Sequence, residues 1–195
     1  MKKIAVKIMG LSYSQRQIGS YVVVLSEVKG QKKIPIIIKP SDAQYIAMKI
    51  ESIKSSLPMI HDLMKGMVDT LSATVREIVI DNFIEGVFYC KIVLKDINGE
   101  KHILHCGAGD AIALSLSFDC QLYVTKNILD EAGVIISDDG TVLDDENEIT
   151  IDEEKDEKIS LESLQKMLED ALENEEYEIA SQLRDKIKDM KAEEK

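Results

Sequence analysis

The sequence is poor in several residue types: it contains no tryptophan, three phenylalanines, three prolines and three cysteines among 195 residues. The cysteines are odd in number and form no Cys-x-x-Cys pair, which argues against a disulfide framework and against a zinc site. We therefore expect Cys90, Cys106 and Cys120 to be buried thiols. A Gly-x-Ser-x-Gly elbow, a Cys–His pair and a Walker loop are also absent, which argues against the corresponding hydrolases and NTPases.

Long apolar runs are missing as well. No run approaches the roughly 20 residues that span a bilayer, and the apolar part of the N-terminal segment is too short for a signal peptide. Hydrophobic residues nevertheless make up 45% of the chain, which argues against disorder throughout. These features predict a cytoplasmic protein with no membrane partner.

The whole chain has a net charge of -12. Positive charge is scarce in only one part of it. Residues 1–135 carry 16 Lys and Arg against 14 Asp and Glu, whereas residues 136–195 carry 8 against 22. The apolar strand and helix patterns of a folded domain lie in the first part. We therefore expect a near-neutral domain at residues 1–135 followed by a strongly acidic tail.

The pattern of residues 1–135 predicts an α+β domain. Strands are expected at residues 4–8, 21–25, 34–38, 74–80, 86–94, 101–106 and 122–124, and helices at residues 41–53, after Pro58, at 110–116 and at 127–132. The Asn98-Gly99 pair is typical of a hairpin turn. Because strands and helices alternate in blocks, we expect a mixed or antiparallel sheet with packed helices.

Two helix signals are specific. Ser41 followed by Gln44 is a capping-box pattern, which predicts a helix start there. The helix after Pro58 carries apolar residues at helical spacing: Leu63, Met64, Met67, Val68 and Leu71. In addition, residues 36–43 and 104–111 each join an apolar strand through a turn to an Asp-Ala pair that opens a helix. This similarity indicates either a duplicated strand-to-helix unit or a coincidence.

The tail has two parts. Residues 136–159 are expected to form an acidic, extended linker, since residues 137–158 hold 11 acidic residues and two lysines without apolar periodicity. Residues 160–195 show the three- and four-residue apolar spacing of two amphipathic helices. Two short helices cannot bury two apolar stripes alone, so we expect this hairpin to pair with a copy of itself or with a partner protein.

Three ordered motifs in the domain resemble those of the bifunctional nuclease (BFN) family. They are Ile60-His61-Asp62-Leu63, Val87-Phe88-Tyr89-Cys90 and Gly109-Asp110-Ala111-Ile112-Ala113-Leu114, with Asp42-Ala43 where the family has an acidic-Ala pair. The tail pattern from Leu164 through Glu176-Tyr177-Glu178 to Leu183-Arg184-Asp185 resembles the UVR motif, a helical hairpin that mediates protein contacts in bacterial excision nucleases. A BFN domain joined to a UVR motif is a known bacterial arrangement.

The BFN resemblance implies a nuclease that acts on RNA or DNA. Hydrolysis of a phosphodiester needs an activated water, charge neutralisation and a proton for the leaving group, which carboxylates with Mg²⁺ or Mn²⁺ and a histidine supply. The candidate catalytic residues are His61, Asp62 and Asp110, with Asp62 and Asp110 as metal ligands. Adjacent helical side chains diverge by about 100°, so His61 and Asp62 can converge only in the first turn.

Each candidate also has a structural interpretation. Asp62 and Asp110 can serve simply as helix caps, and His61 as a partly buried polar residue. His102 and His105 have odd separation on one strand and so face opposite sides. The turn Gly107-Ala108-Gly109 stands where the family usually has an Arg-containing turn.

The alternative function is a non-catalytic oligomeric interaction or regulatory protein that docks partners through residues 160–195. A homo-oligomer is expected on either interpretation, because the apolar strands at 21–25 and 34–38 suggest more apolar surface than one copy can bury.

Overall fold

The structure, a computed structural model, describes residues 2–14, 19–55, 57–135, 161–173 and 177–193. Its centre is an eight-stranded sheet in the order β6-β5-β4-β7-β1-β2-β3-β8. The strands are β1 (Lys3–Tyr13), β2 (Tyr21–Glu27), β3 (Lys32–Ile38), β4 (Thr74–Ile84), β5 (Val87–Lys95), β6 (Lys101–Gly107), β7 (Leu122–Thr125) and β8 (Val134–Ile135). Neighbouring strands pair antiparallel except β4 and β7, which run parallel. The mixed sheet with packed helices confirms the predicted α+β class.

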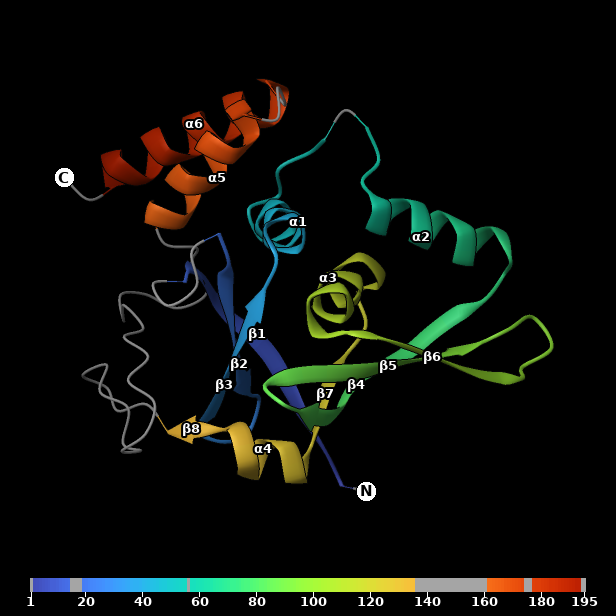
Figure 1. Ribbon diagram of the computed structural model, residues 1–195. Coiled ribbons are helices and arrows are strands. Elements are labelled where there is room, and N and C mark those ends of the chain that lie inside the picture. The colour runs from blue at the N-terminus through green and yellow to red at the C-terminus, as the bar shows by residue number, and fades with distance from the viewer. Residues whose placement is uncertain (1, 15–18, 56, 136–160, 174–176, 194–195) are drawn as a thin grey trace.

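The domain contains two similar halves. The antiparallel strands β1, β2 and β3 lead into helix α1 (Pro40–Ile50), and β4, β5 and β6 lead in the same way into helix α3 (Ala108–Phe118). The two helices pack against each other over the sheet (Figure 1). This arrangement supports a duplicated strand-to-helix unit, and it brings the beginnings of α1 and α3 together.

Two further helices complete the domain. Helix α2 (Ile60–Thr70) packs against α3, and helix α4 (Lys126–Ala132) packs against β4 and β7. None of the helices within the described ranges combines the length and apolarity needed to cross a membrane.

The continuous apolar strands are buried inside the chain. Val23 and Leu25 of β2 and Ile34 and Ile36 of β3 are at most 1% exposed, because these strands lie within the sheet and contribute to the main hydrophobic core. They are therefore not the surplus apolar surface from which an oligomer was expected. Among the large apolar side chains that stay exposed, the largest group on one element lies on α2: Ile60, Leu63, Met64 and Met67.

Helix α1 begins differently from the capping-box expectation. Its N-cap is Lys39, no side chain caps the helix, and Pro40 occupies the first turn. Proline is suited to this position because its fixed φ is helical and its missing N–H would have no partner there. The Ser41 hydroxyl instead donates to Asp42 Oδ1 at 3.3 Å.

The tail forms the predicted helical hairpin, with α5 (Leu161–Glu173) against α6 (Tyr177–Glu193). The hairpin docks on its own domain. The Tyr21 hydroxyl donates to Asp170 Oδ2 at 3.1 Å, and Lys186 Nζ lies 2.8 Å from Glu51 Oε2. Apolar side chains of both helices join the domain's core: Leu164, Met167, Ala171, Ile179, Ala180, Leu183 and Ile187.

The hairpin's apolar faces are thus largely covered by each other and by the domain. The predicted acidic linker, residues 136–159, lies outside the described residues.

Candidate functional site

His61 is the second residue of α2 and the one buried side chain of that fully described helix. It is 2% exposed, and neither ring nitrogen has a hydrogen-bond partner. Tyr45 of α1 packs on the imidazole with ring centroids 4.4 Å apart, which restricts its orientation. A buried polar group without a partner costs free energy, so the arrangement points to a ligand that would satisfy a ring nitrogen.

Two carboxylates face His61 from the beginnings of two other helices. Asp42 is the third residue of α1 and Asp110 the third residue of α3. The potential ligand atoms of Asp42, His61 and Asp110 lie within 4.8 Å of one another, and His61 Nε2 is 3.8 Å from Asp110 Oδ1. We call these three residues the carboxylate–histidine centre.

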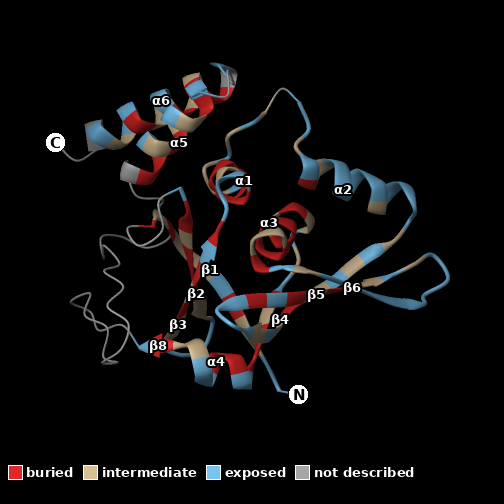
Figure 2. Cartoon of the chain, viewed as in Figure 1, coloured by how far each residue is buried: buried red, intermediate tan, exposed pale blue. Residues whose placement is uncertain are grey.

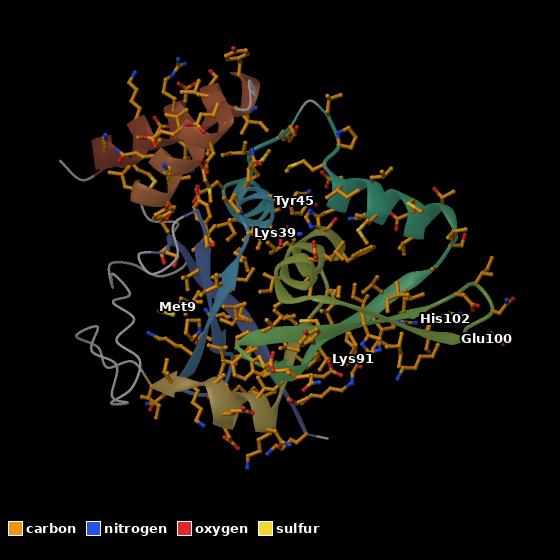
Figure 3. The ribbon with its side chains drawn as sticks, viewed as in Figure 1. Met9, Lys39, Tyr45, Lys91, Glu100 and His102 are labelled. Atoms are coloured by element: carbon orange, nitrogen blue, oxygen red, sulfur yellow. The ribbon has the colours of Figure 1, made fainter. Side chains whose placement is uncertain are left out.

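A lysine lies beside this centre. Lys39 Nζ is 3.5 Å from Asp42 Oδ1 and 3.4 Å from Asp110 Oδ1, and Lys39 lies at the beginning of α1 (Figure 3). Partial burial acts to lower the pKa of Lys39, but the charges of Asp42 and Asp110 outweigh this effect and raise that pKa. The ammonium therefore stays charged at neutral pH and offsets part of the carboxylate repulsion.

Burial shifts the titration of the other members. Burial, followed by the charge of Asp110, raises the pKa of Asp42. Burial lowers the pKa of His61 despite the nearby carboxylates, which favours the neutral imidazole at neutral pH. The neutral imidazole is the form that binds a cation, because one of its ring nitrogens has a free lone pair.

The backbone adds positive potential at the same place. Neither α1 nor α3 has a side-chain cap, and both begin beside the carboxylate–histidine centre. The orphan N–H groups and the helix dipoles favour negative charge at these positions. The same field would favour a phosphate group of a substrate.

Of the three residues that sequence analysis placed in one site, the structure brings two together. Asp62 lies outside the carboxylate–histidine centre because it follows His61 directly on α2. Its Oδ1 accepts hydrogen bonds from the Tyr45 hydroxyl at 2.7 Å and from Lys49 Nζ at 2.9 Å. Its Oδ2 accepts from the Met59 backbone N–H at 3.3 Å, which is the capping role considered above.

The capping interpretation fails for Asp110. The N-cap of α3 is Gly107, and no side-chain hydrogen bond caps the helix. The Asp110 carboxylate accepts from Lys39 instead. The contacts of its carboxylate are therefore made within the carboxylate–histidine centre and with Lys39, and not to the backbone of its own helix.

Asp42 and Lys39 were not expected as site residues from the sequence. The available signal was the similarity between residues 36–43 and 104–111, which aligns Asp42 with Asp110. In the structure both aspartates occupy the same helical position in the two halves, since each is the third residue of its helix. The turn at Gly107 has no arginine, but the Lys39 ammonium supplies a positive charge near Asp110.

A second group of potential ligands lies at the β5–β6 turn. Asp96, Glu100 and His102 come close together, and His102 Nε2 is 3.0 Å from Asp96 Oδ2. His102 and Glu100 are exposed (Figure 3), and Asp96 Oδ1 accepts two backbone N–H groups of the turn. This group is explained by turn formation, and it serves as a control for the buried site.

The fold and the site define an α+β domain with a buried carboxylate–histidine centre, followed by a docked helical hairpin. The chain belongs to the bifunctional nuclease domain family, which matches residues 23–137. The UvrB/UvrC motif matches residues 158–193. The first match includes all members of the carboxylate–histidine centre, and the second spans α5 and α6.

Two relatives come from strains of Mycobacterium tuberculosis. They are the uncharacterized protein MT1877 of strain CDC 1551 / Oshkosh and the uncharacterized protein Rv1829 of strain ATCC 25618 / H37Rv. Each is 27% identical to this chain over 135 residues, which cover 69% of this chain and 79% of the relative.

Proposed function

We propose that this protein is a nuclease that hydrolyses phosphodiester bonds of RNA or DNA at the carboxylate–histidine centre. The observation that carries the proposal is the buried imidazole of His61, whose ring nitrogens have no partner although two carboxylates lie beside it. Such an arrangement is unfavourable as a purely structural device, since it buries the Asp42 carboxylate and an unsatisfied imidazole beside a second carboxylate. Membership of the bifunctional nuclease domain family supports the same reaction.

The donor set fits a divalent cation. Two carboxylate oxygens and one imidazole nitrogen are ligands suited to Mn²⁺, and the carboxylates alone suit Mg²⁺. In this proposal Asp42, His61 and Asp110 hold the cation. When bound, the cation would supply charge neutralisation for phosphoryl oxygens and a more acidic water.

The chain's own residues have separate tasks in this proposal. Asp42 and Asp110 provide the negative charge that holds the cation, and Tyr45 keeps the His61 ring in place. Lys39 is half-exposed, so its ammonium can leave the carboxylates and donate to a phosphoryl oxygen. The uncapped beginnings of α1 and α3 add backbone N–H groups that favour the phosphate.

A cleavage assay on labelled single-stranded RNA and DNA tests the proposal, with Mg²⁺, Mn²⁺ or a chelator. We expect cleavage that needs the cation and falls by at least about 100-fold in His61→Ala and Asp110→Asn. Asp96→Asn and His102→Ala are the matched controls, because they alter a similar but exposed group, and they should cleave normally. Equal activity of His61→Ala and His102→Ala would refute the assignment.

Cation binding gives a readout that does not depend on cleavage. Titration calorimetry should detect Mn²⁺ binding to the wild type and to His102→Ala, but not to Asp42→Asn or Asp110→Asn. The hairpin's match to the UvrB/UvrC motif supports a protein-interaction role for α5 and α6. If the wild type neither cleaves nucleic acid nor binds the cation, the non-catalytic interaction protein is the better interpretation.

A further inference from the structure

Helix α2 turns its apolar side toward solvent. Its large apolar residues are Ile60, Leu63, Met64, Met67 and the adjoining Leu71, which are 62%, 55%, 37%, 58% and 70% exposed. Figure 2 shows the helix exposed over most of its length. An amphipathic helix of a monomeric domain normally buries this stripe, so α2 has the reverse orientation.

The polar side of α2 is the one that contacts the domain. His61 enters the carboxylate–histidine centre, Asp62 pairs with Lys49, and Lys65 Nζ donates to the Ser117 carbonyl at 2.7 Å. These contacts keep three ionisable side chains of α2 beside its own domain. The outward stripe is left without a charge along its centre.

The spacing of the stripe fits a second helix. Ile60, Met64, Met67 and Leu71 follow one another at intervals of four, three and four residues, which is the spacing of a helix–helix seam. A membrane surface or a nucleic acid would require several basic residues beside the stripe. Helix α2 contains one lysine, and its ammonium is bound to the Ser117 carbonyl.

We propose that this stripe is the interface of a symmetric dimer, in which α2 of one copy packs antiparallel on α2 of a second copy. A two-fold axis places the same seam on both sides, so a single apolar stripe is self-complementary. Residues 1–135 are close to neutral, so two domains meeting here are not strongly repelled. The acidic tail's helices lie on the other flank of the domain (Figure 1).

The exposed surface is large enough for this interface. The five side chains of the stripe are 37–70% exposed, and together they leave roughly several hundred Å² of apolar surface, about the largest patch that a monomer usually exposes. Two copies of this surface approach the roughly 1,000 Å² of total buried area that a specific interface needs.

Dimerisation also bears on the site, and this consequence rests on the proposed function. An isolated helix as short as α2 is marginal in water, and its contact with its own domain is mainly polar. Packing against a second copy would hold α2, and with it His61, in the position that the carboxylate–histidine centre requires. The dimer itself does not depend on catalysis.

Sedimentation velocity at low and high micromolar concentration tests the proposal. The wild type should be dimeric at high concentration, and the double variant Leu63→Glu, Met67→Glu should be monomeric. Ile37→Glu is the matched control, since Ile37 is 53% exposed on β3, and it should remain dimeric. Circular dichroism and thermal melting check that the variants are folded.

Hydrogen exchange gives a second readout that needs no substitution. Peptides covering residues 60–70 should exchange more slowly at high protein concentration, whereas peptides from α4 should not change. A wild type that stays monomeric at high micromolar concentration would overturn the proposal, and so would a dimer that survives the double substitution. If the wild type is dimeric but neither cleaves nucleic acid nor binds the cation, the result counts against the proposed function and not against the dimer.

Discussion

Gly109 and Asp42 approach so closely that any side chain at position 109 would displace the Asp42 carboxylate. A Cβ atom placed on Gly109 would lie 2.2 Å from Asp42 Oδ2 and 3.1 Å from its Cγ. The contact joins the first turn of α3 to the first turn of α1. It explains why a glycine precedes Asp110, where the helix needs no unusual backbone angle.

Gly109→Ala should therefore move Asp42. The added methyl group forces the carboxylate away from Asp110 and His61, although alanine itself favours the helix. We expect cleavage and Mn²⁺ binding to fall markedly while the melting temperature changes little. Gly66→Ala in α2 is the control, because nothing lies within 4 Å of its Cβ position. Normal Mn²⁺ binding by Gly109→Ala would contradict this role.

Asp110→Asn should not destabilise the protein when no cation is present. The charge of Asp110 contributes to the raised pKa of Asp42, so the two carboxylates repel each other in the fold. Removing one charge relieves that repulsion, and we expect an equal or higher melting temperature together with lost activity. Asp110→Ala separates this role from that of a helix cap, because alanine would cost a cap about 1 kcal/mol, whereas asparagine caps about as well as aspartate. Differential scanning calorimetry with a chelator present distinguishes the two.

Asp62→Asn should affect stability rather than cleavage. Burial acts to raise the pKa of Asp62, but hydrogen bonds from Lys49 and Tyr45 outweigh this effect and lower that pKa. A lowered pKa means that the carboxylate stabilises the fold fully above about pH 4, and that this stabilisation is lost as the pH falls through the folded value. The variant should melt lower than the wild type at pH 7, and the difference should shrink at acidic pH. Abolished cleavage in a folded Asp62→Asn protein would restore Asp62 as a catalytic candidate.

The three thiols should react slowly. Burial raises the pKa of Cys106 and of Cys120 to about 11 and raises that of Cys90 further. At pH 8 only about one thiol in a thousand at positions 106 and 120 is ionised, and the thiolate is the reactive form. Alkylation followed by peptide mass spectrometry should show rates far below that of free cysteine, increasing toward pH 10. Rapid labelling of Cys106 at pH 8 would contradict this expectation.

The hairpin should contribute to the stability of the whole domain. Leu164 of α5 is fully buried within the domain's core cluster, so Leu164→Ala should cost about 2–5 kcal/mol. Leu172→Ala is the control on the same helix, since Leu172 is 49% exposed, and its effect should be small. Urea unfolding measures both. Equal stabilities would show that the hairpin is not packed on the domain in solution.

Local sequence patterns determined most of the secondary structure. The continuous β-branched residues 21–25 and 34–38, the Asn98-Gly99 turn and the Asp-Ala helix starts each identify an element by short-range rules. The observed strands and helices accordingly lie close to the predicted ranges. The tail hairpin was predictable for the same reason, because its apolar spacing is visible without any long-range contact.

The composition of the site was decided by the tertiary structure. His61 and Asp110 were proposed as neighbours from the sequence, but Asp42 and Lys39 join them only because two separate strand-to-helix units place their helix beginnings side by side. Asp62 lies outside the carboxylate–histidine centre because adjacent helical residues point in different directions, and long-range contacts decide which of the two contacts that centre. The periodicity of α2 likewise shows an apolar stripe but not which way it faces. That orientation follows from which side of the helix the domain binds, and here the domain binds the polar side through His61 and Lys65.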